Sequence, residues 1–97
     1  MPYKLRFHEL AWAEWQKLDG SIKAPLKKKL LDRLQEPRIP SAALSNMPDC
    51  YKIKLRSAGF RLVYRVMDDK LMLLTIAVGK RDKNAVYDFA KLRMTAK

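Results

Sequence analysis

The sequence is short of several residue types on which large classes of protein depend. It has a single cysteine, Cys50, and a single histidine, His8, which excludes an internal disulfide and a zinc site built from Cys and His ligands. No apolar run approaches the roughly 20 residues of a membrane-spanning helix. The start, MPYKLRFHEL, lacks the apolar segment of a signal peptide. We therefore expect a cytoplasmic protein with no metal, cofactor or membrane partner.

Acidic residues are scarce relative to basic ones. The 97 residues include 21 Lys and Arg against 10 Asp and Glu, which gives a net charge of +11. Such an excess of positive charge destabilises the folded chain through repulsion between like charges. The usual reason for a protein to have it is an anionic partner such as nucleic acid. Hydrophobic residues make up 48% of the chain. This composition excludes a disordered chain, and the length fits one domain over residues 1–97.

Hydrophobic periodicity predicts an α+β domain. Segments of alternating apolar and polar residues are expected to be strands: 3–7, 51–56, 60–67 and 71–78. Segments with a helical period are expected to be helices: 9–19, a second that ends before Pro37, and a short one from Asn84. This order predicts a mainly antiparallel four-stranded sheet in two layers, with the helical hairpin packed on one face.

Glycine and proline positions predict where the helical hairpin turns. Gly20 can supply the left-handed residue that ends the first helix. The second helix is expected to open at Ser21 or Ala24, which places Pro25 in its first turn, where a missing N–H is tolerated.

Basic side chains are expected to gather on one face of the sheet, because side chains alternate along a strand. Five basic residues share this face: Lys52, Lys54, Arg56, Arg61 and Arg65. A two-residue turn at Ala58-Gly59 would place Arg56 opposite Arg61. In that register Lys52 lies opposite Arg65. Like charges opposite one another cost about 0.2–1 kcal/mol, so the pairs predict a bound anion.

On the same face of the sheet, the neighbouring strand 71–78 is expected to carry only apolar side chains: Met72, Leu74, Ile76 and Val78. The C-terminal helix, near the basic face, is expected to cover them with Val86, Phe89 and Ala90. Tyr87 and Arg93 would then border the basic residues. So short a helix could be displaced by a partner that brings a better apolar helix.

Two blocks of sequence resemble the RelE family of bacterial toxin–antitoxin modules, part of the RelE/ParE superfamily. They are MPDCYKIKLRSAGFRLVYRV (47–66) and VGKRDKNAVY (78–87). The resemblance implies a ribosome-dependent endoribonuclease that cuts mRNA in the ribosomal A site and so inhibits translation. The ribose 2′-OH would attack the adjacent phosphate, leaving a 2′,3′-cyclic phosphate and a 5′-OH. The catalytic residues implied are Lys52, Lys54, Arg61, Arg81 and Tyr87.

Further basic residues are expected to bind the RNA: Arg56, Arg65, Lys80 and Lys83. One position departs from the family, since close relatives carry a basic residue where this chain has Ser45. We expect weaker binding there. Lys27, Lys28 and Lys29 could touch ribosomal RNA or form a solvated helix face.

The resemblance also implies protein partners. A RelB-type antitoxin would neutralise the toxin, and the complex would repress its own operon, with operator DNA bound through the antitoxin. Trp15 is expected in the core. Trp12 is expected to be half exposed, as part of an antitoxin-binding surface.

The chemistry has no histidine to use, because His8 lies at a strand-to-helix junction and is expected to be structural. Neighbouring cations would lower the pKa of Lys52 and favour the phenolate of Tyr87, so either could be the base. Arg81 would protonate the leaving oxygen, and Arg61 with Lys54 would stabilise the phosphorane. Two alternatives remain: a ParE-like inhibitor of DNA gyrase, and a nucleic-acid-binding module without catalysis.

Overall fold

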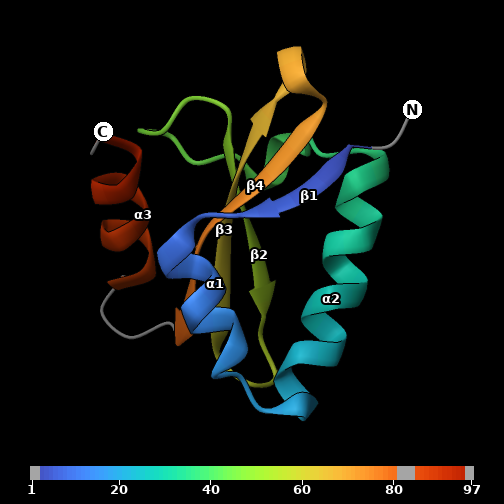
Figure 1. Cartoon of the computed structure of the whole chain (residues 1–97), viewed down its shortest axis with the longest axis vertical. Helices are drawn as coiled ribbons and strands as arrows, with labels where there is room; N and C mark the ends of the chain where they lie inside the picture. Colours follow the sequence, from blue (N-terminus) through green and yellow to red (C-terminus); the bar gives the residue numbers. More distant parts are fainter. Residues whose placement is uncertain (1–2, 81–84, 96–97) are drawn as a thin grey trace.

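Three α-helices and four β-strands make up the part of the chain that the computed structural model describes, residues 3–80 and 85–95 (Figure 1). The elements are β1 (Lys4–Phe7), α1 (Glu9–Gln16), α2 (Gly20–Gln35), β2 (Cys50–Leu55), β3 (Phe60–Met67), β4 (Met72–Lys80) and α3 (Ala85–Thr95). Short 3-10 turns lie at Pro40–Ala42 and Asp68–Lys70. None of the described helices is long and apolar enough to cross a membrane.

The strands form one sheet in the order β1-β4-β3-β2. β4 pairs antiparallel with β3, and β3 pairs antiparallel with β2. β1 pairs parallel with β4, but only along Met72 to Thr75. The prediction of a mainly antiparallel α+β sheet is therefore confirmed. β2 is one edge of the sheet, and β4 has an open edge beyond the end of β1.

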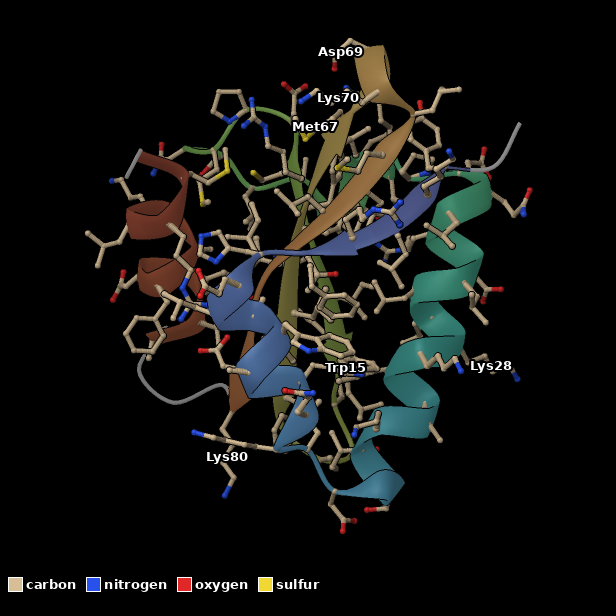
Figure 2. All side chains as sticks on the ribbon, in the orientation of Figure 1. Trp15, Lys28, Met67, Asp69, Lys70 and Lys80 are labelled. Atoms are coloured by element: carbon tan, nitrogen blue, oxygen red, sulfur yellow. The ribbon has the colours of Figure 1, made fainter. Side chains whose placement is uncertain are left out.

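Helices lie on both faces of the sheet (Figure 1). α1 and α2 cover one face with a core that includes Trp15, Leu26, Leu30 and Tyr64. Trp15 lies between the hairpin and the sheet in Figure 2, as predicted. α3 covers the other face with a smaller core that contains Cys50, Val63, Ile76, Val86 and Ala90. Strand residues that alternate between faces therefore enter two different cores.

The turn between α1 and α2 differs from the prediction. α1 ends at Gln16, and Asp19 caps α2 by accepting a hydrogen bond from the backbone N–H of Ser21. Gly20 is thus the first residue of α2 rather than the end of α1, because the Asp19 carboxylate is a strong N-cap. Pro25 consequently lies in the second turn and removes one intrahelical hydrogen bond.

The β2–β3 hairpin has a longer turn than predicted. Arg56 to Gly59 form a four-residue turn, with Gly59 at φ 68°, a conformation that glycine adopts without strain. Arg61 therefore lies opposite Lys54, not opposite Arg56, and Arg65 lies opposite Cys50, not opposite Lys52. The register shift is two residues, so each side chain keeps its predicted face.

A bulge in β4 corrects the predicted apolar strip. Val63 pairs with Ala77 while the next residue, Tyr64, pairs with Thr75, so Ile76 is an extra residue in β4. Met72, Leu74 and Ile76 lie toward α3 as predicted, but beyond the bulge the alternation reverses. Val78 therefore packs in the core under α1 and α2.

α3 covers its face of the sheet with a narrower surface than predicted. Val86 and Ala90 are buried, as expected, but Phe89 is 47% exposed. Phe89 instead stacks under the guanidinium of Arg93, which lies 5.5 Å from the ring centroid. Gly79 leaves room for the helix, since a Cβ there would lie 3.3 Å from Val86. The predicted cap, Asn84, lies outside the described residues.

Candidate nucleic-acid interface

Three of the predicted site residues meet on the face of the sheet toward α3. Lys52 and Lys54 come from β2, and Lys54 lies directly opposite Arg61 of β3. Arg61 is only 7% exposed, and its side chain donates to the carbonyl of Phe60 at 3.0 Å. A nearly buried guanidinium beside an ammonium group is a fixed positive centre. This arrangement suits an anion whose charge increases during a reaction.

Arg65 lies farther along the same face, opposite Cys50. Its Nε is buried and, among the described residues, has no hydrogen-bond partner. Burial raises the pKa of the Cys50 thiol to about 11, against a smaller lowering by the charge of Arg65. Cys50 is therefore a neutral thiol in this core.

Tyr87 approaches the same face from α3. It is half-buried and packs against the core that contains Cys50 and Val63. These two residues are the neighbours of Lys52 on this face, one earlier on β2 and one opposite on β3. Tyr87 also lines an open hollow together with Ser45. The structure thus brings Ser45, where the family resemblance led us to expect a basic residue, beside a predicted catalytic residue.

Arg56 does not join Arg61, because it lies in the hairpin turn. It lines a second hollow, at the edge of β2, with Lys52, Lys54 and two residues of α2. Those two residues are Lys29, which the sequence left open between a contact to ribosomal RNA and a solvated helix face, and Arg33, which sequence reasoning missed. Their separation of four residues puts them on one side of a helix, which is the only signal that could have linked them.

Lys80 lies on the opposite side of the sheet from Arg61. The register places it across from Phe60, whose side chain packs under α1 and α2, and Figure 2 shows Lys80 pointing away from the molecule at the end of β4. Arg81 and Lys83, predicted to act in catalysis and RNA binding, lie outside the described residues.

Three side chains that the sequence singled out lie outside this interface. His8 caps α1 by accepting from the N–H of Leu10 at 3.1 Å, as the prediction of a structural histidine required. Trp12 is 47% exposed and contacts the ring of Phe7. Arg93 forms an ion pair with Glu14 rather than bordering the basic residues.

The chemistry available at this face is that of cations and a phenol. Lys52, Lys54 and Arg61 can bind and neutralise a phosphate, and Lys52 or Tyr87 can move a proton. Among the described residues, no group of His, Cys, Asp and Glu could hold a metal ion. Such a site is poor in acid–base groups, so it depends on a substrate held in a reactive geometry.

Comparison with known proteins gives the class to which this fold and interface belong. The profile of the "ParE toxin of type II toxin-antitoxin system, parDE" family matches residues 5–85. The chain is also 51% identical over 97% of its length to the Escherichia coli K12 "mRNA interferase toxin RelE", of which it covers 99%. The chain therefore belongs to the RelE/ParE family of type II toxin–antitoxin toxins.

Solved structures agree with this assignment. An E. coli RelE double mutant in the free state superposes with a TM-score of 0.90, at 50% identity, over 97% of this chain and 99% of that one. The toxin of the intact E. coli RelBE toxin–antitoxin complex superposes with a TM-score of 0.81, at 52% identity, over 84% of this chain and 99% of that one. The predicted fold and family are both confirmed.

Proposed function

We propose that this protein is a ribosome-dependent mRNA endoribonuclease, the toxin of a type II toxin–antitoxin module. The observation that carries the proposal is the meeting of Lys52, Lys54 and Arg61 on one sheet face, in a chain 51% identical to relatives named mRNA interferases. Three cations around one position bind a phosphate, and a nearly buried Arg61 holds its charge where a phosphorane would form.

The proposed reaction is attack of the ribose 2′-OH on the adjacent phosphate. Lys52 or Tyr87 takes the 2′-OH proton, and the O5′ bond breaks to give a 2′,3′-cyclic phosphate and a 5′-OH. Lys54 and Arg61 stabilise the charge of the phosphorane. Arg81, which lies outside the described residues, is assigned from the family resemblance as the donor of a proton to the leaving oxygen. The ribosome supplies the bent A-site mRNA.

We assign a RelB-type antitoxin and a cytoplasmic location to the same proposal. Structures of E. coli RelE with its antitoxin RelB, intact or as a peptide, support the partner. α3 offers the surface for inhibition, because it buries only Val86, Ala90 and neighbouring side chains against the sheet. An antitoxin helix that replaced α3 would lie against Lys52 and Arg61. Operator DNA would be bound through the antitoxin.

A ParE-like inhibitor of DNA gyrase is the main competing function, since the matching family profile is named for ParE. The presence of Lys52, Lys54, Arg61 and Tyr87 together argues for RNA cleavage. A gyrase inhibitor has no use for a base beside a phosphate site.

The test is cleavage of a reporter mRNA with and without translation, mapped by primer extension. We expect cuts within ribosome-bound codons and no cuts in the same mRNA when its start codon is removed. Gyrase supercoiling is assayed with the same preparation. Inhibited supercoiling with intact mRNA would contradict the proposal.

A further inference from the structure

A second group of basic side chains lies at the free edge of β2, beside the face proposed for cleavage. They surround an open hollow of about 350 Å³ between α2 and the strand. Its polar lining consists of Lys29, Arg33, Ser41, Lys52, Lys54 and Arg56. Among the residues described, this lining includes no acid. The charged side chains around the hollow are therefore all positive, and Ser41 adds a hydroxyl that can donate a hydrogen bond.

Three separate parts of the chain supply these cations. Lys29 and Arg33 lie one turn apart on α2, Lys52 and Lys54 come from β2, and Arg56 comes from the hairpin turn. In the part of the chain that the structure describes, Lys29 and Arg56 form no ion pair. Both are exposed, so they can move toward a ligand. Cations brought together by folding repel one another, and a bound anion removes that repulsion.

Arg33 makes one wall of the hollow rigid. Its Nη1 donates to the backbone carbonyl of Lys52 at 3.2 Å and to the hydroxyl of Tyr64 at 2.8 Å. Its guanidinium also lies 5.7 Å from the centre of the Tyr64 ring. Arginine has five N–H donors, so a half-buried guanidinium held in this way keeps donors for a ligand. Because this side chain is already ordered, binding a ligand costs little further conformational entropy there.

We propose that this hollow binds a backbone phosphate of RNA, separate from the phosphate that is cleaved. The inference rests on the proposed function and extends it. Lys29 and Arg56 are the main contacts, Arg33 is the fixed wall, and Lys52 and Lys54 are shared with the cleavage face. An RNA strand bound at Lys52 therefore continues over the edge of β2 rather than along the sheet. The phosphate belongs to either the mRNA or the ribosomal RNA.

The test compares two double variants that remove the same charge. Lys29→Ala with Arg56→Ala empties the hollow of its exposed cations. Lys17→Ala with Lys70→Ala is the control, since both lysines are exposed and lie outside the hollow. Dissociation constants are measured at several salt concentrations on two probes. One is a short single-stranded 2′-O-methyl RNA, and the other is ribosomes programmed with 2′-O-methyl mRNA, which cannot be cleaved by 2′-OH attack.

We expect the hollow variant to bind about tenfold more weakly, with the slope of log affinity against log salt reduced by about two. The control is expected to stay within about twofold of wild type. A loss on the short RNA assigns the phosphate to mRNA, and a loss on ribosomes alone assigns it to ribosomal RNA. Equal losses in both double variants, or wild-type binding to both probes, would overturn the inference.

Two further measurements make the result decisive. Thermal unfolding of both double variants checks that these exposed substitutions leave the fold intact. Translation-dependent cleavage by the wild-type protein is assayed in parallel. If the wild type cleaves mRNA and the hollow variant binds as the wild type does, only the phosphate site fails. If the wild type does not cleave, the proposed function itself fails.

Discussion

Arg93 of α3 and Glu14 of α1 form a two-point ion pair that joins helices on opposite faces of the sheet. Arg93 Nη1 and Nη2 lie 2.8 and 2.9 Å from the two carboxylate oxygens of Glu14. Arg93 also donates to the carbonyl of Ile76, and Glu14 accepts from the N–H of Val78. The pair therefore satisfies backbone groups of β4 along the edge that β1 leaves uncovered.

Breaking this pair is expected to loosen α3. Glu14→Gln removes the charge partner of Arg93, whose side chain is 12% exposed. Partial burial makes such a loss worth about 1–2 kcal/mol, so we expect amide exchange in α3 to rise about 5- to 30-fold. Cys50 offers a second readout. It lies under α3 with its Sγ 3.9 Å from Met94 Sδ, and its reaction with a thiol reagent should speed up by a similar factor. Glu9→Gln, on the exposed start of α1, should change neither rate.

Arg61 is expected to require its guanidinium and not only its charge. The planar guanidinium of Arg61 is nearly buried and holds several N–H donors in a fixed geometry, which the single ammonium group of a lysine cannot reproduce. We expect Arg61→Lys to slow single-turnover cleavage on the order of 10²-fold, with a much smaller loss in ribosome affinity. Arg6→Lys, at an exposed position of β1, is the control. Equal losses in cleavage and affinity for Arg61→Lys would place this residue in binding alone.

The base is expected to be Lys52 rather than Tyr87. The backbone at Lys52 is held in place, because Arg33 donates a hydrogen bond to the Lys52 carbonyl. Tyr87, in contrast, belongs to α3, a helix that we expect to move. A general base needs a fixed position. Lys52→Ala should therefore abolish the rise of the single-turnover rate with pH, and Tyr87→Phe should retain it. The opposite result would assign the base to the tyrosine.

Tyr64 is expected to contribute to stability through its hydroxyl. This fully buried group donates to the carbonyl of Pro37 at 2.7 Å and accepts from Arg33. Tyr64→Phe leaves both partners short of a hydrogen bond, which should lower the free energy of unfolding by about 1–3 kcal/mol in urea titrations. Tyr51→Phe is the control, because the partner of its hydroxyl among the described residues is the exposed side chain of Arg38. That change should cost less than about 1 kcal/mol.

Asp68 is expected to make the fold acid-sensitive. The hydrogen bond from Tyr3 and the one from Arg38 lower the pKa of Asp68 below its ordinary value of 3.8. Because the folded state favours the carboxylate, Asp68 stabilises the protein above about pH 4, and the benefit is lost as the pH falls through the lowered pKa. Asp68→Asn should flatten the fall in melting temperature below pH 4. Asp69→Asn, at the tip of the same turn, should leave it unchanged (Figure 2).

Local patterns in the sequence were enough to predict the elements and their faces. Helical spacing places Trp15 on the apolar side of α1 and Leu26 and Leu30 on the apolar side of α2, and such a side must be buried, whatever it packs against. The face of Lys52 and Arg61 was also predictable, because a register error of two residues preserves the alternation. An error of one residue would have reversed it, as the bulge at Ile76 did for Val78.

Contacts between distant residues could not be predicted in this way. Arg93 and Glu14 are 79 positions apart, and neither belongs to a pattern that names the other. Arg33 likewise reads as one more basic residue on a helix, and only the packing of α2 against β2 brings it to Lys52. The length of the turn at Gly59 could not be predicted either, because a glycine with a left-handed backbone occurs in turns of more than one length.

The open edge of β4 gives α3 a part in the solubility of the protein. An unpaired strand edge is a template on which another chain can add a strand. Here the side chains of Arg93 and Glu14 occupy the edge groups of Ile76 and Val78 in place of a strand. A chain shortened before α3 would expose that edge together with the apolar side chains beneath the helix. Such a chain should self-associate, and a partner that removes α3 must shield the same edge.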